Sequence, residues 1–574
     1  MAELGDKVSE LAKRRGFFFQ SSEAYGGVAG FQSFGPEGAE LKRKVEDSWR
    51  KRFSTKLGHR EIDAPTVMPE PVFEASGHLD GFDDMIVKCP ECSASIRADH
   101  LVENNTDIDE AEGLSTDQIE VLIEDHDLFC TSCGHELTGE PVEEFNLMFE
   151  TGIGPGNGEK GYLRPETAQG IFVEFPRLKE YARQLPFGIT QIGKAYRNEI
   201  SPRKGLVRTR EFTQAELEHF IDPENDDPDL SSVKDVELKL YPAENQRENS
   251  GYVYMTVEEA VEQEAVQEWV AYYLGVAKKW YVEIGLDMDR FRFRQHQKGE
   301  RAHYAEDCWD AEADIGSEEN EWLEIAGFAY RGDYDLSKHS KHSGDGKDFQ
   351  VFREYDEPRV REVKELNPDM GYFGPEFGEQ SEKVVEKLEE LVKDDPDAFE
   401  DDEVMIELDG ENFMIPAEKA GFETKEVKES GEHFTPHVVE PSFGVDRTVY
   451  ALILHAFEED RVDEEERTVL KFKESVAPTQ VAVFPLMNKE GLGEKAREVA
   501  EMLREEGLSV KYDDTGNIGK RYRRQDEVGT PYCVTVDYET LEEEPETVTV
   551  RDRDSTEQER VKIEKLGDEI SSRL

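Results

Sequence analysis

Two apolar segments separated by a turn-forming cluster constrain the fold of this chain more than any other feature. They run over Ile189–Glu199 and Gly205–Phe220, and the cluster between them, Ser201–Gly205, contains serine, proline and glycine. This pattern predicts an antiparallel hairpin whose loop is longer than a tight turn. Alternation along a strand would put Arg197 and Glu199 on one face of the first arm. Because charges on a sheet face are costly unless they are paired, these side chains indicate a charged ligand; the alternative is a solvated hairpin at a sheet edge.

The charge of the chain is strongly negative. Of its 574 residues, 131 are acidic and 69 basic, so the formal net charge is −62. Such a charge could mean disorder, but strand-like and helix-like apolar patterns recur along the whole sequence. We therefore expect a folded protein of two to four domains with a carboxylate-coated surface.

A surface of this kind indicates a particular environment. Self-repulsion would destabilise the protein in dilute buffer, whereas at molar salt, where the Debye length is about 3 Å, the repulsion is largely screened. This favours the cytosol of an extreme halophile. Because electrostatic affinity for nucleic acid collapses as salt rises, the acidity does not exclude RNA as a partner.

The sequence shows no segment that predicts export or membrane insertion. No apolar run follows Met1–Arg15, and no stretch is long enough to span a bilayer. Six cysteines in a chain of this length do not form a disulfide framework. We expect a soluble cytoplasmic protein with no membrane partner.

Four of the cysteines form two CxxC pairs, Cys89 with Cys92 and Cys130 with Cys133. In a reducing cytosol such pairs predict a structural zinc site, because each forms a turn that presents both sulfurs to one metal ion. The spacer of 37 residues is longer than usual, and its acidic middle, 103–127, reads as an insertion. The alternative is a set of free or redox-active thiols. The other two cysteines, at 308 and 533, are expected to be buried apolar residues.

Changes of pattern divide the chain into parts. A helix over Glu37–Leu57 is followed by a strand over Glu61–Pro65, a pair that often builds a subunit interface but fits an ordinary helix–strand unit equally well. Acidic stretches at 224–250 and 340–435 read as insertions. We expect a domain built from 1–88 and 146–475, a zinc-binding insertion over 89–145, and a compact α/β domain over 476–574.

Several stretches in a fixed order carry a family resemblance. The helix and strand that end at Pro65 come first, followed by RPETAQG (164–170), AYRNEISPRKGLVRTREF (195–212) and EPSFGVDRTVYALI (440–453). Together they resemble the motifs of class II aminoacyl-tRNA synthetases, and specifically of the glycyl-tRNA synthetases. The resemblance covers most of 1–475, and 476–574 is similar to the anticodon-binding domain of that family. It implies an α+β fold: an antiparallel β-sheet catalytic domain with helices, an inserted zinc-binding element and a C-terminal α/β anticodon-binding domain.

The resemblance implies an enzyme that joins glycine to tRNA. Glycine and ATP, with Mg²⁺, would give glycyl-adenylate and pyrophosphate, and glycine would then pass to the 3′ end of tRNA(Gly); the family also implies a homodimer. Because the reacting carboxylate and α-phosphate are both anionic, cations must stabilise the transition state. Arg197 at the α-phosphate and Arg447 near the adenine and γ-phosphate are the expected catalytic residues, since a guanidinium donates a planar fork to phosphoryl oxygens. Two alternatives stay open: a non-catalytic RNA- or DNA-binding relative, and a synthetase for another amino acid.

The motif positions give the expected contacts of ATP and its metal. Glu199 would accept a hydrogen bond from the adenine amino group, Phe212 would stack on the base, and Arg208 would bind the terminal phosphates. Mg²⁺ needs carboxylate oxygens beside bound phosphates, and the candidates are Glu324 and Glu440, each of which could instead be a surface carboxylate at a strand end. The full set of expected ATP contacts is Arg197, Asn198, Glu199, Val207, Arg208, Thr209, Arg210, Glu211, Phe212, Glu324, Ile325, Gly444, Val445, Asp446 and Arg447.

Glycine selection has a simple physical basis in this family. A pocket without room for a Cβ excludes every larger amino acid by steric clash. The carboxylates of Glu166 and Glu216 would then bind the ammonium group, and Arg97, beside the zinc cysteines, resembles another substrate contact. The full set of expected glycine contacts is Arg97, Glu166, Phe212, Glu216, Glu440, Pro441 and Ser442.

The densest basic run of the C-terminal domain is Lys520–Arg524. With a tyrosine inside it, this run could hold tRNA phosphates and stack a base. The alternative is a helix face paired to nearby acids, because charge runs are often merely solvated.

Overall fold

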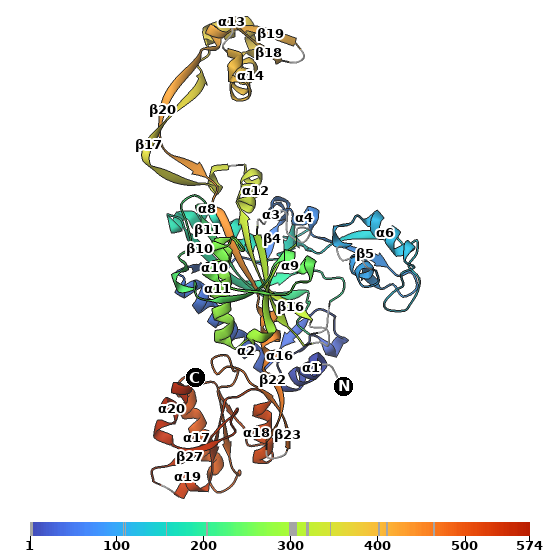
Figure 1. Ribbon diagram of the computed structural model, residues 1–574, viewed down its shortest axis with the longest axis vertical. Helices are drawn as coiled ribbons and strands as arrows, with labels where there is room; N and C mark the ends of the chain where they lie inside the picture. The colour runs from blue at the N-terminus through green and yellow to red at the C-terminus, as the bar shows by residue number, and fades with distance from the viewer. Residues whose placement is uncertain are drawn as a thin grey trace. The chain divides into compact units, whose positions relative to one another are not determined.

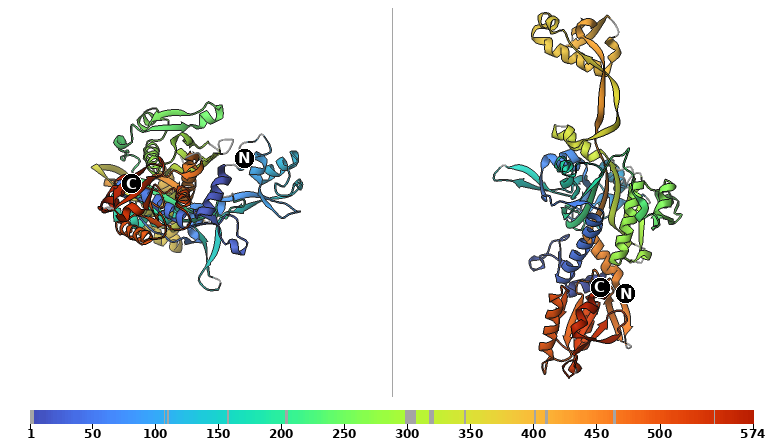
Figure 2. Two further views of the ribbon diagram at one scale, coloured as in Figure 1. Left: turned by 90° about the horizontal axis from the view of Figure 1, so that it is seen from below. Right: turned by 90° about the vertical axis from the view of Figure 1, so that its left-hand side faces the viewer.

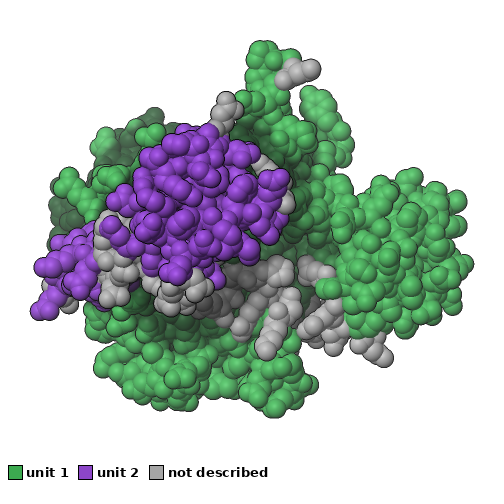
Figure 3. Space-filling model, turned by 90° about the horizontal axis from the view of Figure 1, so that it is seen from above, with its two compact units in different colours: residues 1–349, 436–574 green, residues 350–435 purple. Residues whose placement is uncertain are grey.

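The computed structural model describes residues 4–106, 108, 111–156, 158–202, 205–297, 307–316, 321–344, 346–399, 402–408, 411–462, 465–542 and 544–574. They form two compact units, a larger one of 1–349 with 436–574 and a smaller one of 350–435 (Figures 1 and 3). Arg203 and Lys204, in the middle of the predicted turn, lie outside the described residues. None of the described helices combines the length and the apolar run that crossing a bilayer requires.

A nine-stranded sheet forms the centre of the larger unit (Figure 1). In spatial order its strands are β13 (Val253–Thr256), β12 (Glu237–Tyr241), β14 (Phe291–Gln295), β15 (Asp307–Asp314), β16 (Trp322–Gly332), β21 (His437–Gly444), β11 (Glu211–Ile221), β10 (Phe187–Tyr196) and β3 (Arg60–Glu61). Neighbours are antiparallel except that β12 is parallel to β14 and β10 is parallel to β3. The antiparallel sheet with helices is the α+β architecture that the sequence predicted.

The predicted hairpin is present as β10 and β11, but its arms are shorter than expected. Its loop runs from 197 to 210, so Arg197 and Glu199 lie on the loop and not on one face of a strand. The N–H groups of Asn198 and Arg210 donate to main-chain carbonyls outside the hairpin, each at 2.7 Å. These outside partners draw the backbone away from the β-ladder.

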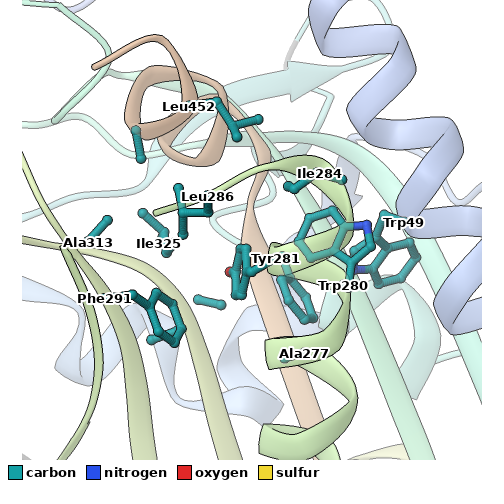
Figure 4. Packing of buried hydrophobic residues seen from close by; sticks show 14 of the residues in the cluster. Trp49, Ala277, Trp280, Tyr281, Ile284, Leu286, Phe291, Ala313, Ile325 and Leu452 are labelled. Carbon is teal, nitrogen blue, oxygen red and sulfur yellow. The ribbon is translucent and has the colours of Figure 1, made fainter. Parts of the chain in front are cut away.

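Apolar helices cover one face of the sheet. The helices of this region are α1 (Leu4–Arg15), α2 (Pro36–Trp49) with a π-helical turn (Arg50–Lys56), α10 (Val257–Glu262), α11 (Glu268–Ile284) and α16 (Val445–Ala456). Figure 4 shows side chains of α11 packed against the strands and against Trp49 of α2. The rings of Trp49 and Trp280 lie 5.8 and 5.4 Å from that of Phe443. Truncating either tryptophan to alanine would cost about 3–5 kcal/mol.

The opposite face of the sheet carries polar side chains. Because side chains alternate along a strand, Ala215 and Leu217 of β11 enter the core, and Glu216 and Glu218 point to the other face. There α7 contacts β10 and β11, and α12 contacts α7 and α3. The elements around this face are β4 (Val67–Pro69), α3 (Glu70–Ser76), α4 (His78–Gly81), β8 (Phe149–Ile153), β9 (Glu159–Leu163), α7 (Ala168–Phe172), α8 (Phe175–Ala182) and α12 (Tyr334–Ser343). The short strands β1 (Phe18–Gln20) and β2 (Gln32–Phe34) instead contact α1 and α2 of the apolar side.

The cysteine pairs lie in a small lobe with a core of its own. Its elements are β5 (Asp83–Lys88), β6 (Ser95–Arg97), α5 (Ala98–Glu103), α6 (Thr116–Asp125) and β7 (Val142–Asn146). Helix α6 begins with a capping box, in which the Ser115 hydroxyl and the Gln118 side chain satisfy each other's backbone N–H groups. The lobe contains the stretch 89–145 that was expected to be an insertion, and it also includes β5 before that stretch.

The stretch 224–250 is not the inserted loop that its polarity suggested. It supplies β12, an interior strand of the central sheet, and helix α9 (Ala243–Glu248). Leu238 and Leu240 alternate with polar residues along β12 and are fully buried. Two alternating apolar side chains suffice for a half-buried strand, and the surrounding acidic residues hid this short signal.

The C-terminal part of the larger unit is the predicted α/β domain. Its five-stranded sheet has the order β25-β24-β26-β27-β28. The elements are the hairpin β22 (Phe457–Val462) and β23 (Glu465–Leu470), then β24 (Val481–Pro485), α17 (Leu492–Glu505), β25 (Val510–Tyr512), α18 (Ile518–Asp526), β26 (Tyr532–Val536), α19 (Tyr538–Glu542), β27 (Thr547–Asp552), β28 (Gln558–Lys562) and α20 (Leu566–Arg573). The sequence did not predict β28, because an exposed edge strand with mostly polar residues lacks the apolar alternation.

The smaller unit begins at 350 and not at 340. Phe349 still belongs to the larger unit, where its ring stacks on those of Phe175 and His339. Within the smaller unit a long two-stranded ribbon carries a head with its own apolar core. The elements are β17 (Val351–Leu366), α13 (Met370–Phe377), α14 (Ser381–Asp394), β18 (Glu403–Leu408), β19 (Glu411–Pro416), α15 (Ala417–Ala420) and β20 (Phe422–Phe434). The acidic helix predicted over 378–394 is α14.

Candidate active site

A pocket opens between the hairpin loop, β16 and the start of α16. About 630 Å³ of space lies within its lining, part of it open to solvent. Its lining is Arg197, Glu199, Leu206, Val207, Arg208, Thr209, Phe212, Thr213, Gln214, Glu324, Ile325, Ser442, Gly444, Asp446 and Arg447. Most of the residues expected to contact ATP are therefore brought together, although they come from segments separated by more than a hundred residues.

Arg197 is held so that its guanidinium faces this pocket. Its Nε donates to the carbonyl of Pro165 at 3.2 Å, and its Cζ lies 5.3 Å from the ring of Phe82 and 5.5 Å from the ring of Phe212. Two aromatic faces fix the plane of a guanidinium and add cation–π attraction. Among the described residues, none is recorded as a hydrogen-bond partner of either Nη atom, so both can donate to a ligand.

Arg447 and Glu324 form the opposite wall. The Nη1 of Arg447 lies 3.1 Å from the carboxylate of Glu324, and its Nε donates to the carbonyl of Val207 at 3.0 Å. Burial alone would raise the pKa of Glu324, but the nearby charges of Arg447 and Arg197 bring it below its usual value. The wall therefore presents fixed charges of both signs, as a nucleotide with its counter-ion requires.

Four of the expected ATP contacts do not line this pocket. The N–H of Asn198 and the guanidinium of Arg210 both bond to main-chain carbonyls and so shape the hairpin loop. Glu211 pairs with Lys194 at 3.3 Å, and Val445 is buried in the apolar core. Direct contact of these four residues with ATP stays a prediction. Their described contacts are with other parts of the protein that surround the pocket.

A group of carboxylates lies beside the pocket. Glu216 is buried on β11 and accepts hydrogen bonds from Ser442 at 2.6 Å, from Gln214 at 2.9 Å and from the hydroxyl of Thr167. Burial, together with the charge of Glu166, raises the pKa of Glu216. Because Ser442 and Gln214 also line the pocket, the carboxylate group and the pocket are parts of one site.

Glu166 and Glu440 complete the group of expected glycine carboxylates. Glu166 accepts from Gln169 at 2.9 Å and lies 3.6 Å from the Nε2 of His78. Burial opposes ionisation of Glu166, but the charges of His78 and Arg331 lower its pKa. For Glu440, burial dominates and raises the pKa to about 8, although Arg331 acts in the opposite direction.

The sequence reasoning missed Arg331, the only arginine recorded in contact with this group among the described residues. Its Nη1 lies 2.6 Å from Glu440, its Nε and Nη2 lie 2.7 and 2.9 Å from Asp335, and its Cζ lies 5.5 Å from the ring of Phe172. An arginine directly after the uncharged run 325–330 of β16 was the available signal, since buried arginines are normally paired.

Pro441 marks a break between β11 and β21. The two strands pair at Ser442 with Glu216 and again at Val439 with His219, but not in between. Proline has no N–H for the ladder, and such residues are otherwise confined to edges and bulges. The ladder between the two strands is therefore interrupted directly after Glu216.

The two candidate magnesium ligands, Glu324 and Glu440, lie apart. Glu440 lies opposite Ala329 on β16, five residues from Glu324, a separation of roughly 16 Å along a strand. The Glu440 carboxylate also turns toward Arg331, which lies further from Glu324. The two carboxylates therefore cannot share one ion. Glu324, at the pocket wall, fits a cation bound with phosphates, whereas Glu440 belongs to the carboxylate group.

Arg97 stays within the cysteine lobe. It lies 3.2 Å from Asp84 and 3.1 Å from Asp99. Burial raises the pKa of Asp84 to about 6, and both Glu199 and Arg208 of the pocket act on this carboxyl. Arg97 is thus close enough to influence the pocket, but its contact with glycine stays a prediction.

The four CxxC cysteines converge. The sulfurs of Cys89 and Cys133, and those of Cys92 and Cys130, are 3.6 Å apart, and all four lie within 4.8 Å of one another. A tetrahedral zinc site with Zn–S bonds of about 2.3 Å has sulfurs about 3.8 Å apart. The geometry fits zinc and does not fit disulfides. Cys308, expected to be a buried apolar residue, is only partly buried, and its sulfur lies within 4.8 Å of ligand atoms of His296 and Asp310.

The basic run of the C-terminal domain is largely paired. On α18, Arg521 is buried and donates to main-chain carbonyls, Arg524 bonds to Asp513, and Arg523 lies 3.3 Å from Glu465. Lys520, Tyr522 and Arg523 also line a second pocket, next to the β22–β23 hairpin. Part of the run is therefore paired within the protein, as the second interpretation expected. Another part lines a pocket where RNA could bind, as the first interpretation requires.

Comparisons with known proteins agree with this geometry. The family described as tRNA synthetase class II core domain (G, H, P, S and T) matches 149–456, and the family described as anticodon binding domain matches 480–573. A glycine–tRNA ligase of Methanothrix thermoacetophila is 46% identical over 98% of this chain and 96% of its own length. Those of Methanothermobacter thermautotrophicus and Methanocaldococcus jannaschii are 46% and 45% identical, over 98% and 100% of this chain and 97% and 99% of their own. A crystal structure of prolyl-tRNA synthetase from Cryptosporidium parvum with L-proline and AMP has a TM-score of 0.52 at 12% identity, covers 100% of this chain and 79% of its own, and shares the fold. The chain belongs to the glycine–tRNA ligases of the class II tRNA synthetases.

Proposed function

We propose that this protein activates glycine with ATP, forming glycyl-adenylate and pyrophosphate, and transfers glycine to the 3′ end of tRNA(Gly). One observation carries the proposal most directly: Ser442 lines the arginine pocket and also donates to Glu216 of the carboxylate group. An anion-binding pocket and an ammonium-binding group thus share a wall, which is what the joining of a nucleotide to an amino acid requires.

In the activation step a glycine carboxylate oxygen attacks the α-phosphorus, and the bond from that phosphorus to the β-phosphate oxygen breaks. No proton is transferred, so the protein must orient the reactants and stabilise negative charge. Arg197 has the fixed plane and the free Nη donors for the α-phosphate, and Arg208 and Arg447 flank the space for the remaining phosphates. A magnesium ion held at Glu324 would neutralise part of the phosphate charge.

On the glycine side, Glu166, Glu216 and Glu440 would surround the ammonium group. Their negative field favours a cation, and the Ser442 hydroxyl fixes one of them. In the transfer step a ribose hydroxyl of the tRNA 3′ end attacks the glycyl carbonyl, and AMP leaves. The domain that matches the anticodon-binding family would hold the other end of the tRNA.

We also propose three properties of the whole protein. Zn²⁺ bound by Cys89, Cys92, Cys130 and Cys133 would stabilise the cysteine lobe, as their convergence suggests. Two copies would associate, since β3 leaves one edge of the central sheet uncovered by a further strand among the described residues. The net charge of −62 fits work in the cytoplasm of an extreme halophile.

Glycine-dependent ATP–pyrophosphate exchange tests the central proposal. The assay would run at molar KCl with each of the twenty amino acids, followed by charging of tRNA with radiolabelled glycine. We expect exchange with glycine alone and charging of tRNA(Gly). Exchange with another amino acid instead of glycine would mean that this amino acid is the substrate. No exchange by folded protein would favour the non-catalytic RNA-binding alternative.

A further inference from the structure

Glu218 is a buried acid that the proposed reaction does not use. It lies on β11 with no exposed surface, and among the described residues neither carboxylate oxygen has a hydrogen-bond partner. A buried ion without partners is among the most costly arrangements in a protein, and such groups stay neutral or mark a function. The Glu218 side chain points to the polar face of the sheet. Packing of the apolar core therefore does not explain why an acid occupies this position.

The groups that face Glu218 are mostly acidic. Glu216 lies two residues along the same strand and Glu440 lies on β21, where Pro441 interrupts the ladder. The nearby charges from the other packed elements are Arg331 of β16 and Asp335 of α12.

Arg331 cannot neutralise all of these acids. Its guanidinium is already bonded to Glu440 and to both oxygens of Asp335. Neighbouring carboxylates with one shared cation cannot all be ionised, so at least one of them holds a proton. Burial in the first place, and the charge of Glu440 in the second, raise the pKa of Glu218 well above its usual value.

We propose that Glu218 is protonated in the glycine-free protein and releases this proton to solvent when the ammonium group of the substrate binds beside it. This rests on the proposed function, because the cation is that of glycine. The ammonium keeps its own three protons, and one O–H bond of Glu218 breaks. The net charge of the buried group stays constant, since one positive charge enters as one proton leaves.

The expected coupling is large enough to measure. At an effective dielectric constant of about 20, a unit charge at about 5 Å shifts a pKa by roughly two units. Release of one proton makes the apparent glycine affinity rise by up to about tenfold per pH unit in the range where Glu218 is protonated in the free protein and ionised in the complex. Glu218 is thus a positioning residue. Its ionised form attracts the ammonium group, and its protonated form avoids an unpaired buried charge when glycine is absent.

Calorimetric titration with glycine between pH 6 and 8, in buffers of different ionisation enthalpy, counts the released protons. We expect Glu218→Gln, which keeps shape and neutrality, to release about one proton fewer than the wild type and to flatten the pH dependence of the KM for glycine. The matched control is Glu237→Gln, an exposed carboxylate on β12 of the same sheet, which should leave proton release unchanged. Equal proton release by the wild type and Glu218→Gln would overturn the proposal.

Infrared difference spectroscopy provides a second measurement on the wild type alone, in case the variant does not fold. Glycine binding should remove one carboxylic-acid C=O band, and glycolate, which lacks the ammonium group, should not. No loss of carboxylic-acid C=O intensity on glycine binding would overturn the role of Glu218. Absence of any glycine binding would instead overturn the proposed function.

Discussion

Replacement of Arg197 tests the pocket where negative charge must be stabilised. Its guanidinium is fixed by two aromatic rings at 5.3 and 5.5 Å and by one main-chain carbonyl, and its side chain lines the pocket. We predict that Arg197→Ala removes most glycine-dependent pyrophosphate exchange. Arg197→Lys should retain an intermediate rate, because lysine keeps the charge but loses the planar fork and the stacking.

The magnitude follows from what the side chain supplies. Loss of one preorganised donor to developing charge costs about 3–4 kcal/mol, a factor of about 10²–10³ in kcat. Each of the two ring contacts stabilises the position of the Arg197 side chain by about 0.5–1 kcal/mol. Because the substitution also removes the contact that orders Phe212, part of the loss in activity comes from that ring. Because the interaction strengthens in the transition state, kcat should fall more than the affinity for ATP.

The assay is pyrophosphate exchange at molar KCl with ATP and glycine varied separately, together with a melting curve of each protein. Arg177→Ala serves as the matched control, since this arginine of α8 has a side chain that is 87% exposed. A kcat for Arg197→Ala within about threefold of the wild type, in a folded protein, would refute the assignment of Arg197 to the reacting phosphate.

Four further outcomes are expected. Cys92→Ser should lower bound zinc, measured by elemental analysis, and lower the melting temperature, whereas unchanged zinc would disprove the four-thiolate site. Asp526→Ala should destabilise the C-terminal domain by about 3–5 kcal/mol, because it leaves the buried Arg551 and Arg467 without their shared carboxylate; urea unfolding would show this, and a loss below about 1 kcal/mol would contradict it. Burial lowers the pKa of His455 to about 4, so its contribution to stability is complete above pH 6.5 and is lost as pH falls toward 4; the decline in melting temperature over that range should be smaller in His455→Gln. Dialysis from molar to about 0.1 M salt, where the Debye length is about 10 Å, should lower activity and the melting temperature, and unchanged values would disprove the halophilic interpretation.

Local signals in the sequence predicted much of the fold. The β10–β11 hairpin, helix α2 and the elements β24, α17, β25, α18, β26 and β27 follow from periodicity and turn residues within short windows. The CxxC spacing likewise predicted that four sulfurs from two distant pairs converge, because each pair needs only a local turn, and the structure places them together. Predictions of this kind succeed where the determining interactions lie within about ten residues.

The tertiary structure decided the details of the site. The N–H groups of Asn198 and Arg210 bond to carbonyls outside the hairpin, and the strand ends at Tyr196, so Arg197 lies on a loop and not on a strand face. The separation of Glu324 from Glu440 depends on the register of β16 and β21, strands about a hundred residues apart, and no local pattern encodes it.

By itself, the sequence therefore determined the class of protein, the antiparallel hairpin, the metal-type cysteine spacing and most of the residues that line the pocket. Only the tertiary structure showed that Arg331 is shared between Glu440 and Asp335, and that Glu218 is buried beside them without a donor. The physical reason is that a side chain's type and periodicity are local properties. The charge balance of a buried group, in contrast, is the sum over neighbours that four separate elements supply.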